Sequence, residues 1–530
     1  MARPVKAAEQ VRLRYGLYEL LITRQDLEAF AQTGVAEGDL KTLVSRLGDK
    51  AELLQGALQA EYELDPVLAN RFAYTRSGVQ LLTAAGEFVQ TESGLNGFKA
   101  LRAALTLAAS DPAGLTMLSF LEHFPSEMRV SIGDALGLAE DYGALLGGTQ
   151  QAVAQLVAET EMAAQDGARV DFSQLPDPQM LGEAAVSVQT LEFYDQGRDR
   201  TIPLELYVPE ASSGDAETAE ETVPVIVVSN GLGARRDRFK DLAMHLASHG
   251  FAVALPDHPG SDRARLQAFY RGFEAENFEP GEYIDRPLDV SFILDELSRL
   301  NSESFSGRLN PEQAGVFGYS FGGTTALALA GAKIDLAHLQ TSCDTRSSLF
   351  NISLLYQCRA LELPEGAVKN AELKDDRVQA IYVFVPFSRS LYGPEGMANV
   401  EGPVLWEATD KDILTPFVVE QLPAFSWLSD SVERGEDRYL AITAGLPHAR
   451  ITLEVLNRLT GQEAVDWEEI KPIAEGYHQT LSTGFFQVHL AGNERYRPYL
   501  QAQGAQYLTQ EPYRLTWKDT PLTENLVIGE

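Results

Sequence analysis

The larger, C-terminal part of the sequence predicts an α/β fold, in which helices cover both faces of a mostly parallel sheet. Two observations lead to this prediction. From Val223 onward, short apolar runs alternate with stretches of helical periodicity. One of these runs leads into a serine at the centre of a G-x-S-x-G pattern, Gly318–Gly322, and an Ala- and Leu-rich helix follows it. The chain has 530 residues, too many for one compact domain, and its 45% hydrophobic content can fill a sizeable core.

The N-terminal part, residues 1–180, is expected to form a separate all-α domain of unknown role. Thr23 and Asp26 are spaced like the two residues of a capping box, and Gly34 can end the helix that starts there. Asp39–Leu47 carries apolar residues at helical spacing. No cluster of catalytic side chains is apparent in this part.

Residues 181–530 are expected to hold the sheet. Strands joined through helices run parallel, because such a crossover returns the chain to the same end of the sheet. The predicted strands are Val186–Phe193, Thr201–Val208, Val225–Val228, Phe251–Leu255, Ala314–Phe317, Val378–Val385, Pro403–Glu407 and Tyr439–Ile442. The predicted helices are Arg238–His249, Pro287–Leu300 and Phe321–Ala330.

Before this alternation, Ala211–Thr222 is acidic and of low complexity, which predicts a solvated loop. Two segments depart from the alternation, Arg263–Tyr283 and Lys333–Asp375. Lys333–Asp375 is too long for an ordinary connection and is interpreted as a lid insertion over a site. It contains Cys343 and Cys358, the only cysteines of the chain. They form either one local disulfide or two reduced, buried thiols, and the sequence leaves both open.

The composition limits the partners and the location. The net charge of −33 repels phosphate backbones and anionic lipid surfaces, so nucleic acid is a poor candidate. No apolar segment approaches the 18 residues that suggest a transmembrane helix, and the first residues lack the apolar stretch of a signal peptide. We expect a periplasmic or secreted protein if the cysteines are bonded and a signal was removed, and a cytoplasmic one otherwise. Two cysteines with His338 nearby are too few for structural zinc, so no metal or cofactor is expected.

The G-x-S-x-G pattern predicts a nucleophilic serine at Ser320. Such a serine must stand on a sharp turn so that its hydroxyl clears the sheet. Gly318 and Gly322 remove side chains that would collide across this turn, and Gly323 lets the helix lie close to the strand. A serine hydroxyl is a weak nucleophile, so it requires a base and a group that orients the base.

The base is predicted to be His448. In this architecture the order along the chain is serine, acid, histidine. His448 directly follows a predicted strand, on a loop that can reach the top of the sheet. His338 comes too early, in the predicted lid, and His478 and His489 fall in amphipathic stretches.

The acid is predicted to be Asp412, with Asp410 as the alternative. Both follow the predicted strand that ends at Glu407. Asp412 is favoured because a turn of the kind that accompanies this acid follows it, and Asp410 is then expected to shape that turn. Two backbone N–H groups must also stabilise the oxyanion that forms during attack. They are predicted at Phe321, which opens the helix, and at Leu232, in the glycine-containing loop after Val225–Val228.

Three stretches carry a family resemblance: Asn230–Arg235, Leu246–Asp262 and Gly318–Ala326. They resemble α/β-hydrolases of the platelet-activating-factor acetylhydrolase and dienelactone hydrolase group, and bacterial polyester hydrolases share the layout. The resemblance covers roughly residues 185 to 500. It implies that Leu232 and Phe321 supply the oxyanion donors.

The resemblance also bears on three other features. In the acetylhydrolases the acid ends the strand after the nucleophile helix, but here that strand runs into Pro386 without a carboxylate. The acid is therefore one strand later, as in the dienelactone and polyester relatives, which favours Asp412. Tyr319 stands where relatives often have histidine or tryptophan and is expected to line an acyl pocket. Val11–Pro125 looks like the helical domain that precedes such hydrolases in cyanobacterial-type proteins, without an established role.

Together these residues predict a cofactor-free serine hydrolase that cleaves carboxylic esters. The substrate is expected to be lipid-like, short-to-medium acyl or polyester-type. The alternative is an inactive scaffold that acts as a binding protein. The natural substrate and the oligomeric state are not fixed by the sequence.

Overall fold

The computed structural model describes residues 8–15, 17–48, 51–62, 64–112, 114–210, 222–343, 346–428, 437–450, 452–454, 457 and 465–519. The chain divides into two compact units. The smaller comprises Met1–Ala144 with Gln267–Asn277 and Asp344–Phe350. The larger comprises Leu145–Leu266, Phe278–Cys343 and Asn351–Glu530. The predicted acidic loop falls, except for Thr222, outside the described residues.

The smaller unit combines helices with a four-stranded sheet, so the prediction of an all-α domain was wrong in this respect. Its helices are α1 (Arg24–Thr33), α2 (Gly38–Leu47), α3 (Ala51–Gln59), α4 (Pro66–Tyr74), α5 (Arg76–Phe88), α6 (Phe98–Ala108) and α7 (Met117–His123). Its strands are β1 (Gln10–Tyr15), β2 (Tyr18–Thr23), β3 (Val89–Thr91) and β4 (Met128–Ser131), in the order β2-β1-β4-β3. The strands have only three to six residues, and β1 pairs with β4 across more than a hundred residues of chain. Local periodicity does not detect such pairing. Helix α1 begins and ends as predicted, with a capping box of Thr23 and Asp26 and a left-handed Gly34.

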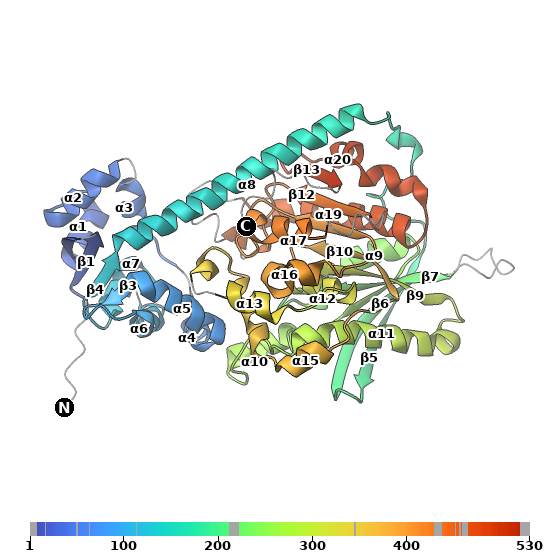
Figure 1. Ribbon diagram of the computed structural model, residues 1–530, viewed down its shortest axis with the longest axis horizontal. Helices are drawn as coiled ribbons and strands as arrows, with labels where there is room; N and C mark the ends of the chain where they lie inside the picture. Colours follow the sequence, from blue (N-terminus) through green and yellow to red (C-terminus); the bar gives the residue numbers. More distant parts are fainter. Residues whose placement is uncertain are drawn as a thin grey trace. The chain divides into compact units, whose positions relative to one another are not determined.

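The larger unit is built on a nine-stranded sheet in the order β13-β12-β11-β10-β9-β7-β8-β6-β5, which confirms the predicted α/β fold (Figure 1). The strands are β5 (Val186–Asp195), β6 (Arg200–Pro209), β7 (Val223–Ser229), β8 (Ala252–Pro256), β9 (Leu309–Tyr319), β10 (Val378–Phe384), β11 (Val404–Ala408), β12 (Arg438–Thr443) and β13 (Leu515–Asp519). The six central strands from β12 to β8 are parallel, and the antiparallel strands lie at the two edges. All eight predicted strands are present; β13 had not been predicted.

Helices cover both faces of this sheet. They are α9 (Lys240–Ser248), α11 (Glu282–Ser304), α12 (Phe321–Leu329), α16 (Arg389–Met397), α17 (Leu422–Ser426), α19 (Trp467–His489) and α20 (Ala502–Leu508), with shorter helical turns at Phe172–Gln174, Arg236–Phe239, Phe417–Gln421 and Glu494–Leu500. Strand β7 shows how the two layers form. Val225 and Val227 belong to the core cluster that includes residues of α11 and α12, and Ile226 and Val228 belong to the cluster that includes residues of α9 and α19. Alternate residues of a strand point to opposite faces, so a strand buried on both faces is apolar throughout.

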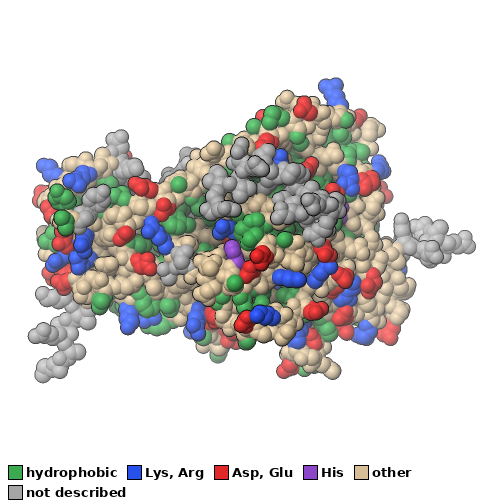
Figure 2. Space-filling model, in the orientation of Figure 1, with side chains coloured by type: hydrophobic (Ala, Val, Ile, Leu, Met, Phe, Trp, Pro, Cys, Tyr) green, Lys and Arg blue, Asp and Glu red, His purple; other side chains and the backbone are tan. Residues whose placement is uncertain are grey.

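Two further helices continue from one unit into the other, α8 (Ile132–Asp166) and α10 (Arg263–Arg271). None of the helices that the structure describes is long and apolar enough to cross a bilayer. On the face shown in Figure 2, acidic and basic side chains are interspersed.

The predicted lid segment consists of short helical elements, α13 (Leu336–Ser342), α14 (Leu354–Gln357), α15 (Glu365–Asn370) and turns at Ser347–Leu349 and Cys358–Glu362. Cys343 and Cys358 form a disulfide with an S–S distance of 2.08 Å. The amide of Ser353 donates to the carbonyl of Leu414, 2.9 Å away, and thereby ties the segment to the loop after β11. That this segment acts as a lid stays a proposal.

Candidate active site

Ser320 stands on a sharp turn between β9 and α12, at the centre of the sheet. Its backbone has φ 54° and ψ −115°, a region that residues other than glycine rarely adopt. The glycines make the turn possible: a Cβ at Gly318 would lie 2.2 Å from the carbonyl oxygen of Gly322, and a Cβ at Gly322 would lie 1.8 Å from that of Ser229. The amide of Ser320 donates to the carbonyl of Phe384, which fixes the turn against β10.

A chain of hydrogen bonds joins Ser320, His448 and Asp412. The Nε2 atom of His448 is 3.1 Å from the Oγ atom of Ser320, and its Nδ1 atom is 2.6 Å from a carboxylate oxygen of Asp412. All three side chains are buried, and 8% of Ser320 is exposed. The three residues come from the ends of β9, β11 and β12, which are neighbours or near neighbours in the sheet. This is the order and geometry in which a histidine can take the proton of a serine.

The loop after β11 holds Asp412 as an ionised acceptor. Its carboxylate accepts the amides of Leu414 and Thr415 at 2.8 and 2.9 Å and the hydroxyl of Thr415 at 2.5 Å. Burial alone would raise the pKa of the Asp412 carboxyl, but the neighbouring His448 and the hydrogen bonds from His448 and Thr415 lower it below its ordinary value. An ionised Asp412 can accept a hydrogen bond from Nδ1 of His448, and in that arrangement Nε2 can accept from the hydroxyl of Ser320.

Asp410 has a different place. Its carboxylate accepts the amide of Gly445 at 2.7 Å, and the hydroxyl of the adjacent Thr409 donates to the carbonyl of Leu446. Both contacts hold the loop that carries His448. Asp410 therefore anchors that loop, and Asp412 contacts the imidazole.

Tyr319 lies behind the histidine. Its hydroxyl donates to the backbone carbonyl of His448 at 2.9 Å, and its ring stacks on Phe384 with centroids 5.5 Å apart. The guanidinium of Arg238 lies 4.5 Å from the ring centre. In this structure the side chain supports the loop of His448; a role in an acyl pocket stays a prediction.

The loop that is predicted to hold the oxyanion, residues Ser229–Gly233 and here called the oxyanion loop, runs directly beside Ser320. A Cβ at Gly231 would lie 3.3 Å from the Cβ of Ser320 and 2.9 Å from the ring of Tyr319. Within the described chain, the backbone amides of Leu232 and Phe321 have no acceptor. Phe321 is the first residue of α12, where the amide has no partner inside the helix. Both amides are thus available to a substrate oxygen.

The other three histidines after Ser320 lie in different surroundings, and none hydrogen-bonds to Ser320 in the described structure. His338 packs edge-on against Trp427, and His489 packs against Tyr439 and Phe485. His478 is buried, with its Nε2 3.5 Å from the carboxyl of Glu407. Burial, and to a smaller extent the nearby charge of Arg238, lowers the pKa of His478 to about 3, so this ring is neutral.

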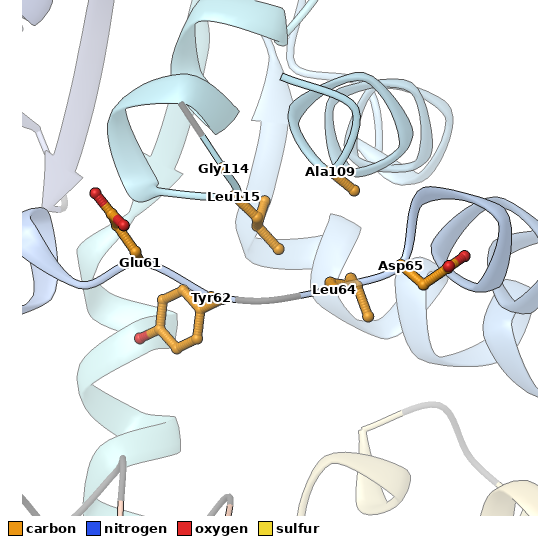
Figure 3. Close-up of a pocket in the computed structure, with 7 residues that line it drawn as sticks. All are labelled: Glu61, Tyr62, Leu64, Asp65, Ala109, Gly114 and Leu115. Atoms are coloured by element: carbon orange, nitrogen blue, oxygen red, sulfur yellow. The ribbon is translucent and has the colours of Figure 1, made fainter. Parts of the chain in front are cut away.

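In the described residues, no group of three or more His, Cys, Asp or Glu side chains is arranged to hold a metal ion. The smaller unit has a shallow hollow of about 380 Å³ lined by Glu61, Tyr62, Leu64, Asp65, Ala109, Gly114 and Leu115 (Figure 3). Its two carboxylates point away from each other, and Asp65 already accepts the first amides of α4. We assign no chemistry to this hollow.

Comparisons with known proteins agree with this fold. Residues 7–131 match the family described as "Alpha/beta hydrolase of unknown function (DUF1400)", and residues 199–285 match "Platelet-activating factor acetylhydrolase, isoform II". These matches support an α/β-hydrolase of the acetylhydrolase-like group. A curated relative, the platelet-activating factor acetylhydrolase of Cavia porcellus, is 25% identical over 158 residues. That match covers 23% of this chain and 34% of the relative, so the chain spans about a third of the relative's length.

The buried carboxyl of Glu407 leads to a prediction about stability. It accepts the hydroxyls of Tyr382 and Thr443, and burial raises its pKa from an ordinary 4.5 to about 7. Between these two values the folded protein binds a proton that the unfolded chain does not, so this group stabilises the fold at low pH and loses that contribution as the pH rises through 7. Glu407→Gln should therefore raise the free energy of unfolding above pH 7, by up to about 3 kcal/mol, and change it little at pH 5.

Urea unfolding of the wild type and of Glu407→Gln at pH 5 and pH 8.5 measures this effect. Glu475→Gln is the control, because that carboxyl is only partly buried on α19. If the free energies of unfolding of wild type and Glu407→Gln differ by the same amount at both pH values, the Glu407 carboxyl of the folded protein does not hold the extra proton.

Proposed function

We propose that this chain is a hydrolase of carboxylic esters with Ser320 as its nucleophile. The observation that carries the proposal is the continuous hydrogen-bond chain from Ser320 through His448 to Asp412. The matches to hydrolase families support the same reaction class. The free amides at Leu232 and Phe321 provide the second requirement, a place for the oxyanion.

In the first half of the reaction, His448 takes the hydroxyl proton of Ser320 as the oxygen attacks the ester carbonyl. The carbonyl oxygen becomes an oxyanion, which accepts from the amides of Leu232 and Phe321. Asp412 holds the Nδ1 proton and stabilises the imidazolium that forms. His448 then gives the proton from Nε2 to the leaving alkoxide, the bond to the alcohol breaks, and the acyl group remains on Ser320.

In the second half, water takes the place of the alcohol. His448 removes a proton from the water as its oxygen attacks the acyl carbonyl, and a second oxyanion forms at the same two amides. Collapse of this intermediate breaks the bond to Ser320, whose oxygen receives the proton from His448. The carboxylic acid leaves and the enzyme returns to its starting state without a cofactor.

The substrate we propose is a lipid-like ester. The relative from Cavia porcellus is named as an acetylhydrolase of platelet-activating factor, which supports a lipid ester in general terms. The side chains next to Ser320 are apolar, since Phe278, Tyr283 and Phe387 lie with ring centroids 5.0 to 5.7 Å from the ring of Phe321. The disulfide between Cys343 and Cys358 favours an oxidising compartment for this chemistry.

Replacement of the nucleophile tests the proposal. Ser320→Ala should lower turnover of p-nitrophenyl esters by about 10⁴-fold or more, because it removes the hydroxyl that lies beside the base. Rates on acetate, butyrate and octanoate esters measure the loss and the preferred acyl length. Ser298→Ala is the control, since among the described residues that hydroxyl bonds only to the carbonyl of Leu294 in α11. Undiminished turnover by a folded Ser320→Ala would remove the serine from the mechanism, and no turnover by the wild type would favour a binding scaffold.

The two carboxylates after β11 give a matched pair. Asp412→Asn should lower kcat by about 10⁴-fold, because an amide favours the wrong histidine tautomer. Asp410→Asn should lower kcat less than about tenfold, since the amide oxygen of asparagine can still accept from Gly445. Initial rates on one p-nitrophenyl ester, with circular dichroism to check folding, separate the two. A larger loss from Asp410→Asn would exchange their roles.

A further inference from the structure

A buried ionic cluster lies behind the oxyanion loop. It consists of Arg200, His258, Glu282, Arg286 and Asp289, contributed by β6, α11 and the loop after β8. His258, Glu282, Arg286 and Asp289 have at most 2% of their surface exposed. Arg200 pairs with Glu282 and Asp289, both at 2.8 Å, so the charges of the cluster are compensated. Burying so many charges is costly, and the hydrolytic mechanism above uses none of them.

The cluster holds the oxyanion loop directly at two residues and, through Ser261, at a third. The Nη1 atom of Arg286 donates to the carbonyl of Asn230 at 2.6 Å. The Oγ atom of Ser229 is 3.0 Å from Nε2 of His258. The amide of Gly233 donates to the carbonyl of Ser261 at 2.8 Å, and the hydroxyl of Ser261 accepts from Nε of Arg286 at 2.7 Å.

Arg286 also reaches the other half of the oxyanion hole. Its guanidinium lies 4.2 Å from the centre of the Phe321 ring. Burial lowers the pKa of Arg286 to about 10, opposed by Glu282 and Asp289, so the side chain stays charged near neutral pH. One cation therefore contacts the loop of Leu232 and the residue whose amide is the second donor. A charged donor makes a stronger hydrogen bond than a neutral one, and a buried bond of this kind resists displacement.

Ser229, His258 and Asp289 repeat the hydrogen-bond order of the catalytic residues, but they do not form a second active site. Nδ1 of His258 is 2.9 Å from Asp289, whose carboxylate also binds Arg200. Ser229 is completely buried, and its carbonyl packs so closely on Gly322 that a Cβ there would lie 1.8 Å away. A substrate carbonyl has no access to this hydroxyl. The hydrogen bonds from Asp289 through His258 to Ser229 instead fix the first residue of the oxyanion loop.

We propose that Arg286 is a positioning residue for the oxyanion hole, acting through the carbonyl of Asn230 and the ring of Phe321, with His258 holding Ser229 in the same loop. This inference rests on the proposed ester hydrolysis. The carbonyl of Gly231 accepts from the amide of Ala234 at 3.3 Å. In a trans peptide the N–H points away from the C=O, so the amide of Leu232 points away from Ala234. Contacts that fix the neighbouring Asn230 help to keep this peptide in place. Donors that are fixed before the reaction stabilise the oxyanion without a cost of reorganisation.

The experiment compares Arg286→Met with Arg286→Lys in the full-length protein. Sites are counted by titration with a fluorophosphonate, and kcat, KM and the affinity for a trifluoromethyl ketone are measured per active site. The ketone adds to a serine and places an oxyanion in the hole. Arg286→Met should lower kcat about 10- to 100-fold, less than the loss of a donor itself, and leave KM nearly unchanged. Ketone affinity should fall in proportion, and Arg286→Lys should recover part of both losses.

Arg377→Met is the matched control, because Arg377, just before β10, is also an arginine with several partners. It bonds to Asp375 and, in α11, to Asp295 and the carbonyl of Ser291. It should lose stability but keep kcat and ketone affinity per active site. If Arg286→Met does not fold, Ser229→Ala provides the test and should lower kcat about 3- to 10-fold with a parallel loss of ketone affinity.

Wild-type kcat and ketone affinity in Arg286→Met, or in Ser229→Ala where that variant is needed, would overturn the positioning role. Equal losses in Arg377→Met would do the same. Failure of the wild type to turn over esters would instead overturn the proposed function, so the two failures are distinguishable.

Discussion

The contact between Gly322 and the carbonyl of Ser229 is the constraint on which the rest of the site depends. It presses the turn after β9 against the end of β7, so that Ser320 and the oxyanion loop are adjacent. The left-handed backbone of Ser320 costs of order 1–3 kcal/mol and persists only where the surroundings enforce it. Here the amides of Gly323 and Thr324 bond to the carbonyl of Ser320, and the amide of Ser320 bonds to β10.

From this turn the parallel sheet brings the other groups within reach. The ends of β11 and β12 lie on the same edge of the sheet as the end of β9, so loops after them can present an acid and a base to one serine. Asp410 bonds to the loop of His448, and Tyr319 supports the same loop from the carbonyl side. The position of the imidazole is therefore set by its own loop after β12, by the loop after β11 and by Tyr319 at the end of β9.

Much of this arrangement could be predicted from local sequence. The strand, glycines and helix around Ser320 are contiguous, and His448 and Asp412 each directly follow a strand. The small sheet of the N-terminal unit could not be predicted, because its strands are short and β1 pairs with the distant β4. Arg286 was also missed. Its position within α11 gives no sign of burial, because the hydroxyl and the carbonyl that bind its guanidinium belong to Ser261 and Asn230, which are distant in sequence. The acetylhydrolase family match ends at residue 285, so the roles proposed for Arg286, Ser320, Asp412 and His448 rest on geometry.

The central claim is that Ser320 is the nucleophile and that His448 activates it. The most direct measurement is mass-spectrometric mapping of the residue that a fluorophosphonate labels in the wild type and in His448→Ala. The account predicts one adduct, on the peptide that contains Ser320, formed at least about 10²-fold more slowly when the base is removed. An adduct on a different serine, or equal labelling rates in the two proteins, would contradict it.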